Sequence, residues 1–164
     1  MPLTLDGNGD ISGLVAGALP ANVIGAGGVI QVVSGYASAC TTTSGTTFVD
    51  SGITASITPT SSANKILIIV NVNGLFNGGT ANLGHKLSIV RNSTNIHLFC
   101  TYVNYIGTGV ALLTAASSNY LDSPATTSAT TYKLQFAKSD STSGTVSVQH
   151  NSDVSSITLM EIAG

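Results

Sequence analysis

Thr131-Tyr132-Lys133-Leu134-Gln135-Phe136 is the stretch of sequence that decides the fold of this chain. Its apolar side chains alternate with polar ones, and successive side chains of a β-strand point to opposite faces. An alternation with a period of two therefore predicts a strand with one buried face and one face in water. The pattern returns at Val146, Val148 and His150, and again in the last predicted strand, Ser156 to Ile162, where Ile157 and Leu159 are in phase with Glu161.

Strands of the same kind are predicted in the N-terminal half. Val29 to Val33 forms a first strand, and Val49 to Thr58 a second strand that ends before Pro59. Ile66 to Val70 is apolar at every position, which predicts a strand in the middle of a sheet with both faces covered. Asn71 and Asn73 return the chain to the surface, and residues 74–84 are predicted to form a loop. Arg91 to Thr94 is a polar turn between the two strands of a predicted hairpin.

Seven or eight short strands with turn residues between them predict an all-β protein, and no ten consecutive residues carry a helical stripe. We expect an antiparallel β-sandwich or jelly roll. This sandwich should span residues 28–164. Residues 1–27 are rich in glycine and small side chains, so they predict an extended attachment or trimerisation segment that gains order only against other chains.

Few charges and many hydroxyl groups describe the expected surface. Charged residues make up 7% of the chain, against about a quarter in a typical soluble domain, and the net charge is −2. Because no basic patch is present, we expect no nucleic-acid binding. Glycine, Pro20, Asn22 and Gln31 interrupt the apolar residues near the N-terminus, so we expect no membrane insertion. Met1 to Asp10 carries no basic residue and does not resemble a secretory signal.

No metal, cofactor or catalytic site is predicted. Asp6, Asn8 and Asp10 imitate the start of a calcium loop, but Ile11 and Gly17 occupy positions that such a loop gives to glycine and glutamate. Cys40 and Cys100 lack metal or redox spacing, which leaves a single disulfide or two buried thiols. His85, His97 and His150 lie on different predicted strands, and there is no nucleophile motif and no pair of carboxylates. The sequence therefore favours a protein that is not an enzyme.

Two side chains with an uncertain role interrupt the apolar faces. His150 is expected to be a hydrogen-bonded core or interface histidine, although three copies of it around a symmetry axis could hold an ion. Glu161 could pair with Lys65 or with Lys133, or it could lie in water at the end of its strand.

Candidate contact residues for a partner come from two segments predicted to be loops. The segment from Asn73 to Gly84 contains Asn77 and Asn82, and the irregular segment from Tyr102 to Tyr120 also contains Tyr105. Small polar residues with a few aromatic rings are typical of adaptable recognition surfaces. The tyrosines could stack on sugars or contact a partner, or they could belong to the core.

Several segments, in their order along the chain, resemble the knob domain of bacteriophage fibre proteins, especially those of marine phages. They are Ser56-Ile57-Thr58-Pro59, Asn64 to Asn73, Tyr120-Leu121-Asp122-Ser123-Pro124, Thr130-Thr131-Tyr132 and Ile157 to Ile162. Leu5 to Ile11 with the Gly/Ala/Pro-rich residues after it resembles the leader of such virion proteins.

This resemblance implies a homotrimer of jelly rolls, similar to the C1q and tumour necrosis factor architecture. The trimer would be assembled in the host cytoplasm and carried on the exterior of the phage particle. It implies no catalytic residues. A tail fibre or fibre tip would contribute to host recognition by contacting a host surface glycan or an outer-membrane protein. A capsid fibre, decoration or tail-connector protein would instead have a structural role. In either case residues 1–27 would bind other virion proteins.

Overall fold

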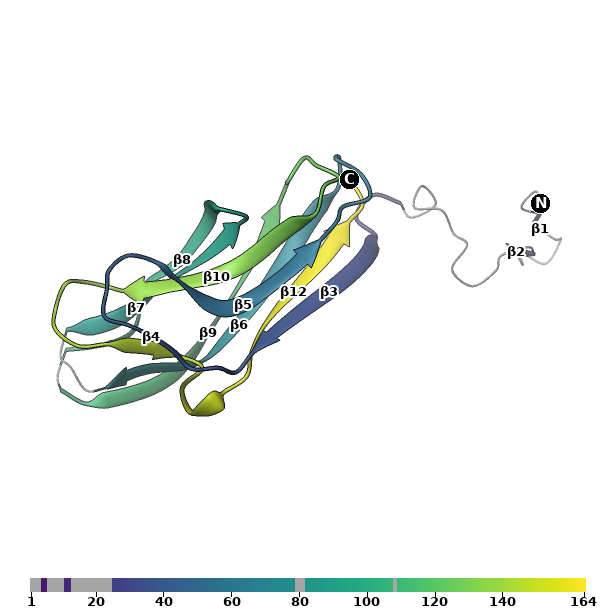
Figure 1. Cartoon of the computed structure of the whole chain (residues 1–164). Helices are drawn as coiled ribbons and strands as arrows, with labels where there is room; N and C mark the ends of the chain where they lie inside the picture. The colour runs from purple at the N-terminus through teal and green to yellow at the C-terminus, as the bar shows by residue number, and fades with distance from the viewer. Residues whose placement is uncertain (1–3, 6–10, 13–24, 79–81, 108) are drawn as a thin grey trace.

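A computed structural model describes residues 4–5, 11–12, 25–78, 82–107 and 109–164 of this chain (Figure 1). The Asp6, Asn8 and Asp10 group and most of the predicted attachment segment lie outside the described residues. The strands are β1 (Thr4–Leu5), β2 (Ile11–Ser12), β3 (Val29–Ala37), β4 (Thr41–Thr43), β5 (Val49–Ile57), β6 (Lys65–Gly78), β7 (Leu83–Arg91), β8 (Thr94–Ile106), β9 (Ala111–Asp122), β10 (Thr130–Lys138), β11 (Val146–Val148) and β12 (Ser155–Ile162).

The strands from β3 to β12 form two antiparallel sheets that pack face to face (Figure 1). One sheet has the order β5-β10-β7-β8. In the other sheet β3, β12 and β6 lie side by side, β9 pairs with the far edge of β6, and β11 and β4 extend the sheet beside the end of β6. Four pairs are nested inside one another: β7 with β8, β6 with β9, β5 with β10 and β3 with β12. This nesting is the wrapping of a jelly roll, so the predicted fold class is confirmed.

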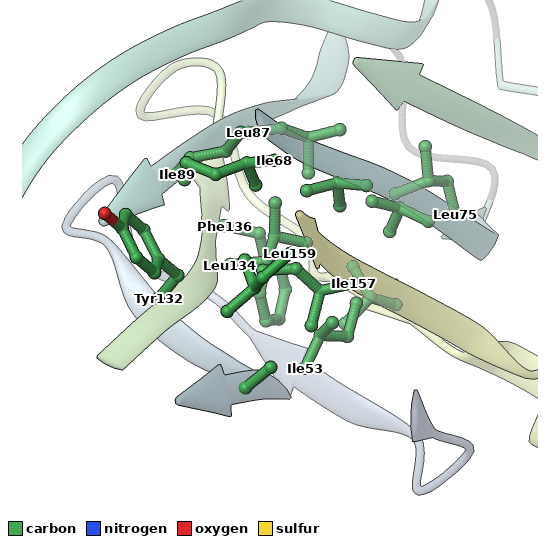
Figure 2. Packing of buried hydrophobic residues seen from close by; sticks show 14 of the residues in the cluster. Ile53, Ile68, Leu75, Leu87, Ile89, Tyr132, Leu134, Phe136, Ile157 and Leu159 are labelled. Atoms are coloured by element: carbon green, nitrogen blue, oxygen red, sulfur yellow. The ribbon is translucent and has the colours of Figure 1, made fainter. Parts of the chain in front are cut away.

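The core lies between the sheets and is made by the alternating faces that the sequence predicts. In β10 Tyr132, Leu134 and Phe136 are wholly buried, and they pack against Ile53 of β5 and Leu159 of β12 (Figure 2). The outward residues of β5 from Asp50 to Ser56 are exposed. Burying one such side chain stabilises the fold by about 1.5–3 kcal/mol, so these alternating strands carry much of the stability.

Residues 74–78 are not a loop, which corrects the prediction for this part of the chain. β6 continues through a bulge between Val72 and Leu75, and it ends only at Gly78. Gly74 makes the bulge possible, because its φ is +63° and a Cβ there would lie 2.4 Å from the backbone nitrogen of His150. The extra bulge residues break the period of two, so the alternation of apolar and polar residues does not predict the second half of the strand.

The segment from Tyr102 to Tyr120 is also regular, although the sequence predicts its least ordered part there. It contains the end of β8 and most of β9. The pairing of β8 with β7 shifts register several times between Leu83 and Val90. On β9 the inward positions include Thr114 and Ser118, which lack the apolar character of a core face. Bulges in one strand and small polar side chains in the other explain the wrong prediction.

An ion pair joins the two sheets at one end of the sandwich. Arg91, at the end of β7, places Nη1 3.0 and 2.9 Å from the two carboxylate oxygens of Asp122, at the end of β9. The hydroxyl of Tyr132 on β10 donates to Asp122 Oδ2 at 2.7 Å. Burial raises the pKa of Tyr132, and the hydrogen bond to Asp122 adds to the effect. Tyr132 therefore stays protonated and remains a donor.

Replacing Tyr132 with phenylalanine should lower the free energy of unfolding by about 1.5–2 kcal/mol, because a buried carboxylate loses a donor. Chemical denaturation of the two proteins measures the difference. Tyr120→Phe removes a hydroxyl from a half-buried ring and should change stability by no more than about 0.5 kcal/mol. Equal losses in both variants would contradict a specific role for the Tyr132 hydroxyl.

Candidate recognition surface

Two exposed tyrosines and an asparagine form a connected group at one end of the sandwich. The Tyr105 hydroxyl on β8 donates to Asn82 Oδ1, which lies just before β7, at 2.9 Å. The Tyr102 ring meets the Tyr105 ring edge-on, with 5.6 Å between centroids and 76° between planes. The two tyrosines are 55% and 44% exposed. Three of the five predicted contact residues are thus brought together, although two of them lie on a strand.

The loop between β10 and β11 holds this group in place. The Thr142 hydroxyl, which has one proton to donate, lies within hydrogen-bond distance of both the Asn82 carbonyl oxygen, at 2.9 Å, and Asp140 Oδ1, and the Thr142 N–H donates to Asp140 Oδ1 at 2.9 Å. Hydrogen bonds from the Thr142 side chain and backbone hold the pKa of Asp140 below its usual value. Ser139 exchanges two hydrogen bonds of 2.9 Å with Gly84.

Lys138, at the end of β10, also holds the loop between β10 and β11 in place. It is 4% exposed, and its ammonium group donates to the carbonyl oxygens of Thr142 and Gly144. A buried ammonium group needs such acceptors, so the loop backbone is held to one conformation around it. Sequence reasoning did not identify Lys138, Asp140 or Thr142 as part of the site, because the loop is joined to Asn82 only by folding.

The other two predicted contact residues lie elsewhere. Asn77 is wholly buried in β6 and donates to the Leu83 carbonyl oxygen at 2.6 Å, so its predicted place in an exposed loop is wrong. Tyr120 on β9 is half-buried and stacks on His97, with 4.7 Å between ring centroids. It packs against the core from the Asp122 end of β9.

His150 leaves the register that the sequence predicts for it. β11 ends at Val148, and Gln149 takes a left-handed conformation with φ 52° before a 3₁₀ turn at His150–Ser152. The His150 ring then stacks on Phe76, with 3.9 Å between centroids and 8° between planes. His85 is the histidine that lies in the core: it is wholly buried, and its Nε2 is 2.9 Å from the Ser147 carbonyl oxygen.

Glu161 binds neutral donors and neither of the lysines considered for it. Its Oε1 accepts hydrogen bonds from the Thr60 N–H at 2.7 Å, the Thr60 hydroxyl at 2.8 Å and Asn64 Nδ2 at 2.6 Å. Gln31 Nε2 donates to Oε2 at 2.5 Å. Lys133 binds Asp50 at 2.8 Å instead. Glu161 is wholly buried, so a place in water at a strand end is also wrong.

The pKa of the Glu161 carboxyl is set by two opposing effects. Burial raises it, and the hydrogen bonds from Asn64, Gln31 and Thr60 lower it; together the hydrogen bonds win, so the pKa lies below its usual value. The carboxylate is charged at neutral pH and holds β3, β12 and the β5–β6 connection together.

The two cysteines of this chain are not joined by a disulfide. Cys40 and Cys100 are both free, and Cys40 is exposed, so neither the disulfide nor a pair of buried thiols is found. Burial raises the pKa of the half-buried Cys100 thiol. Across the described ranges, no three His, Cys, Asp or Glu side chains gather closely enough to hold a metal ion. No helix in that part of the chain is long and apolar enough to span a membrane.

Solved structures give the comparison with known proteins. No family model and no curated protein matches this chain. The VP2 subviral particle of infectious bursal disease virus matches with a TM-score of 0.51 and 16% identity over 82% of this chain. The Gx strain of that virus matches with a TM-score of 0.50 and 15% identity, again over 82% of this chain.

The likeness is one of fold. This chain spans about a third of the length of the solved chains, 33% and 32% respectively. At these identities the matches establish a shared β-sandwich arrangement and carry over no site residue.

Proposed function

We propose that this protein is a non-enzymatic structural component of a virus particle, namely a trimeric tail fibre or fibre tip of a bacteriophage that contributes to host recognition. The observation that carries the proposal is the jelly-roll fold shared with a protein that forms a subviral particle. The order of the segments that resemble phage fibre knobs supports the phage assignment.

The outward side chains of β5 and β10 support a place on the outside of a particle. The outward side chains of β5 and β10 include Thr54, Ser56 and Thr131, and the hydroxyls of Ser56 and Thr131 are 2.7 Å apart. Asp50 and Lys133 form the ion pair on this side. A surface that relies on hydroxyl groups changes little with ionic strength, since salt screens charges and not neutral hydrogen bonds.

The two ends of the sandwich suit two different tasks. The Gly27 N–H donates to the Ala163 carbonyl oxygen at 2.9 Å, so the chain enters the sandwich beside its own C-terminus. The Tyr102–Tyr105–Asn82 group lies at the other end of β6, roughly 40 Å away for a strand of this length. A leader bound to the particle would therefore direct the tyrosines away from it, towards the host surface.

The tyrosines should bind a glycan or a polar protein surface by stacking and hydrogen bonding. Both rings present faces to solvent at low conformational cost, and their neighbours are amides and hydroxyls. Tyr102→Ala with Tyr105→Ala should weaken adsorption of the purified protein to host cells at least about tenfold, since exposed tyrosines are common binding hot spots.

Thr54→Ala with Ser56→Ala, on β5 at the other edge of the sheet that contains β8, is the matched control and should leave adsorption unchanged. Flow cytometry with labelled protein measures both. If the tyrosine variant adsorbs as well as the unaltered protein, the recognition role is wrong, and a capsid fibre, decoration or tail-connector role attached through residues 1–27 would replace it.

A further inference from the structure

The outward face of the β3-β12-β6-β9 sheet carries an unusual share of the exposed apolar side chains. Among the described residues ten large apolar side chains are exposed, and six of them lie on or beside this face. They are Val29, Val32, Tyr36, Leu113, Leu121 and Val154, with exposed fractions from 46% to 71%. On a monomeric protein, clustered apolar side chains of this kind mark an interaction surface.

Strand register joins part of this face into a continuous apolar row. Met160 on β12 lies opposite Val32 on one side and Leu67 on the other, and Leu67 lies opposite Leu121. The row therefore crosses four strands, a distance of about 14 Å at the usual strand spacing. Leu67 and Ile69 remain half-buried, so a single chain covers only one face of β6 completely, and the coverage of both faces expected for Ile66 to Val70 would need further copies.

A hollow lies at the far end of the same face. It has a volume of about 380 Å³ and lies between β6, β9 and the turn before β12, with Leu113 and Val154 in its lining. The β6 bulge at Asn73 and Gly74 forms its floor. A flat apolar row beside a hollow gives a partner both a surface to cover and a place to insert a side chain.

Charge on this face favours a second copy of the same chain. Lys65 lies at one end of the face, where it pairs with Ile162, and Asp153 borders the hollow at the other end. No other charged side chain points outward from the described residues of these four strands. Two copies therefore meet without repulsion between like charges, whereas an acidic or a basic partner would find no opposite patch.

The opposite sheet gives the contrast. In the described residues of β5 and β10 no large apolar side chain is exposed, and the outward positions carry threonine, serine, an ion pair and Gln135. Among the described residues, the exposed large apolar side chains of that sheet, Leu98, Tyr102 and Tyr105, lie on β8, so its β5–β10 half is polar where the β3-β12-β6-β9 face is apolar. Such asymmetry is expected when one face is covered by another subunit and the other stays in water.

We propose that the outward face of the β3-β12-β6-β9 sheet is the interface at which copies of this chain associate, with the Val32–Met160–Leu67–Leu121 row at its centre. The inference rests on the homotrimer proposed above and adds the surface that holds it together. The Tyr102–Tyr105–Asn82 group remains free in this arrangement, because it belongs to the end of β8 and to residues beside β7.

Light scattering of the full-length chain tests the interface. We expect the mass of three copies of the 16.5-kDa chain. Val32→Lys with Leu121→Lys should raise the dissociation constant about a hundredfold or more and give a monomer, because the new charges face each other across the interface. Thr54→Lys with Ser56→Lys on β5 is the matched control and should leave the trimer intact.

The possible results test the proposed interface and the proposed threefold assembly separately. A dimer broken by the β3 and β9 substitutions would support the interface and overturn the threefold assembly. An oligomer that the substitutions leave unchanged would overturn the interface and leave the trimer. A monomeric unaltered chain would overturn both. If circular dichroism shows that the lysine variant is unfolded, Val32→Ser with Leu121→Ser replaces it, and an unweakened association of this variant would likewise overturn the interface.

Discussion

Replacing Glu161 with alanine should lower the free energy of unfolding by about 3–5 kcal/mol. The carboxylate is wholly buried and accepts hydrogen bonds from Gln31, Thr60 and Asn64. Removing it leaves these donors without an acceptor in a place that water reaches poorly. It also releases the β5–β6 connection from β12, so the end of the sandwich that holds both β3 and the C-terminus should loosen.

Urea denaturation of both proteins measures the loss. Glu161→Gln keeps the shape of the side chain and one acceptor oxygen, but its NH₂ group faces donors that it cannot accept from. The free energy of unfolding should therefore fall by about 2–3 kcal/mol. Asp50→Asn is the control, because the Asp50–Lys133 pair is exposed and should contribute less than about 1 kcal/mol. A Glu161→Ala protein as stable as the Asp50→Asn protein would show that the buried hydrogen bonds contribute little.

Stability should also fall as the pH drops from 6.5 towards 4, because His85 is buried in its neutral form. Burial lowers the pKa of His85 from 6.5 to about 4, against the weaker opposing effect of its backbone hydrogen bonds. The unfolded chain binds a proton below pH 6.5 and the folded chain does not. The contribution of neutral His85 to the free energy of unfolding is therefore complete above pH 6.5 and is lost as the pH falls to about 4. This is a change in stability of about 3 kcal/mol.

Denaturation curves collected between pH 7 and pH 4 measure this slope. His85→Gln keeps a donor for the Ser147 carbonyl oxygen but does not titrate, so its stability should change much less over the same range. Glu161 has a lowered pKa, so its contribution is complete above its usual pKa of 4.5 and is lost only at lower pH. A His85→Gln protein with the slope of the unaltered protein would assign the pH dependence to another group.

The parts of the fold that the sequence predicts are those where one face is apolar and the other polar. β5 and β10 show this because Ile53, Leu134 and Phe136 face the core without interruption. In β9 the alternation of apolar and polar residues is weak because Thr114 and Ser118 take inward positions. In β6 the Gly74 bulge interrupts the alternation before the second half of the strand. Periodicity reports the polarity of side chains, so it misses a strand whose inner face is partly polar.

The candidate site follows a similar division. Tyr102 and Tyr105 could be chosen from the sequence because they are aromatic residues in a segment without regular alternation, but their contact with Asn82 depends on β8 lying beside β7. Glu161 stands out in the sequence as a carboxylate in an apolar phase. Its partners could not be inferred, because neutral amides and a backbone N–H leave no charge pattern to search for.

The nested pairing of the strands has a consequence for how the chain folds. The outermost pair joins β3, near the start of the sandwich, to β12 at its end. β3 leaves the ribosome before the other strands of the sandwich but pairs with β12, the last of them, so loop closure over the whole sandwich precedes this pairing. Folding should take milliseconds to seconds, as for other all-β sandwiches. During that interval the unpaired edge of β3 is open to pairing with other chains that are being synthesised on the same messenger RNA. Association of these incomplete chains would compete with completion of each fold.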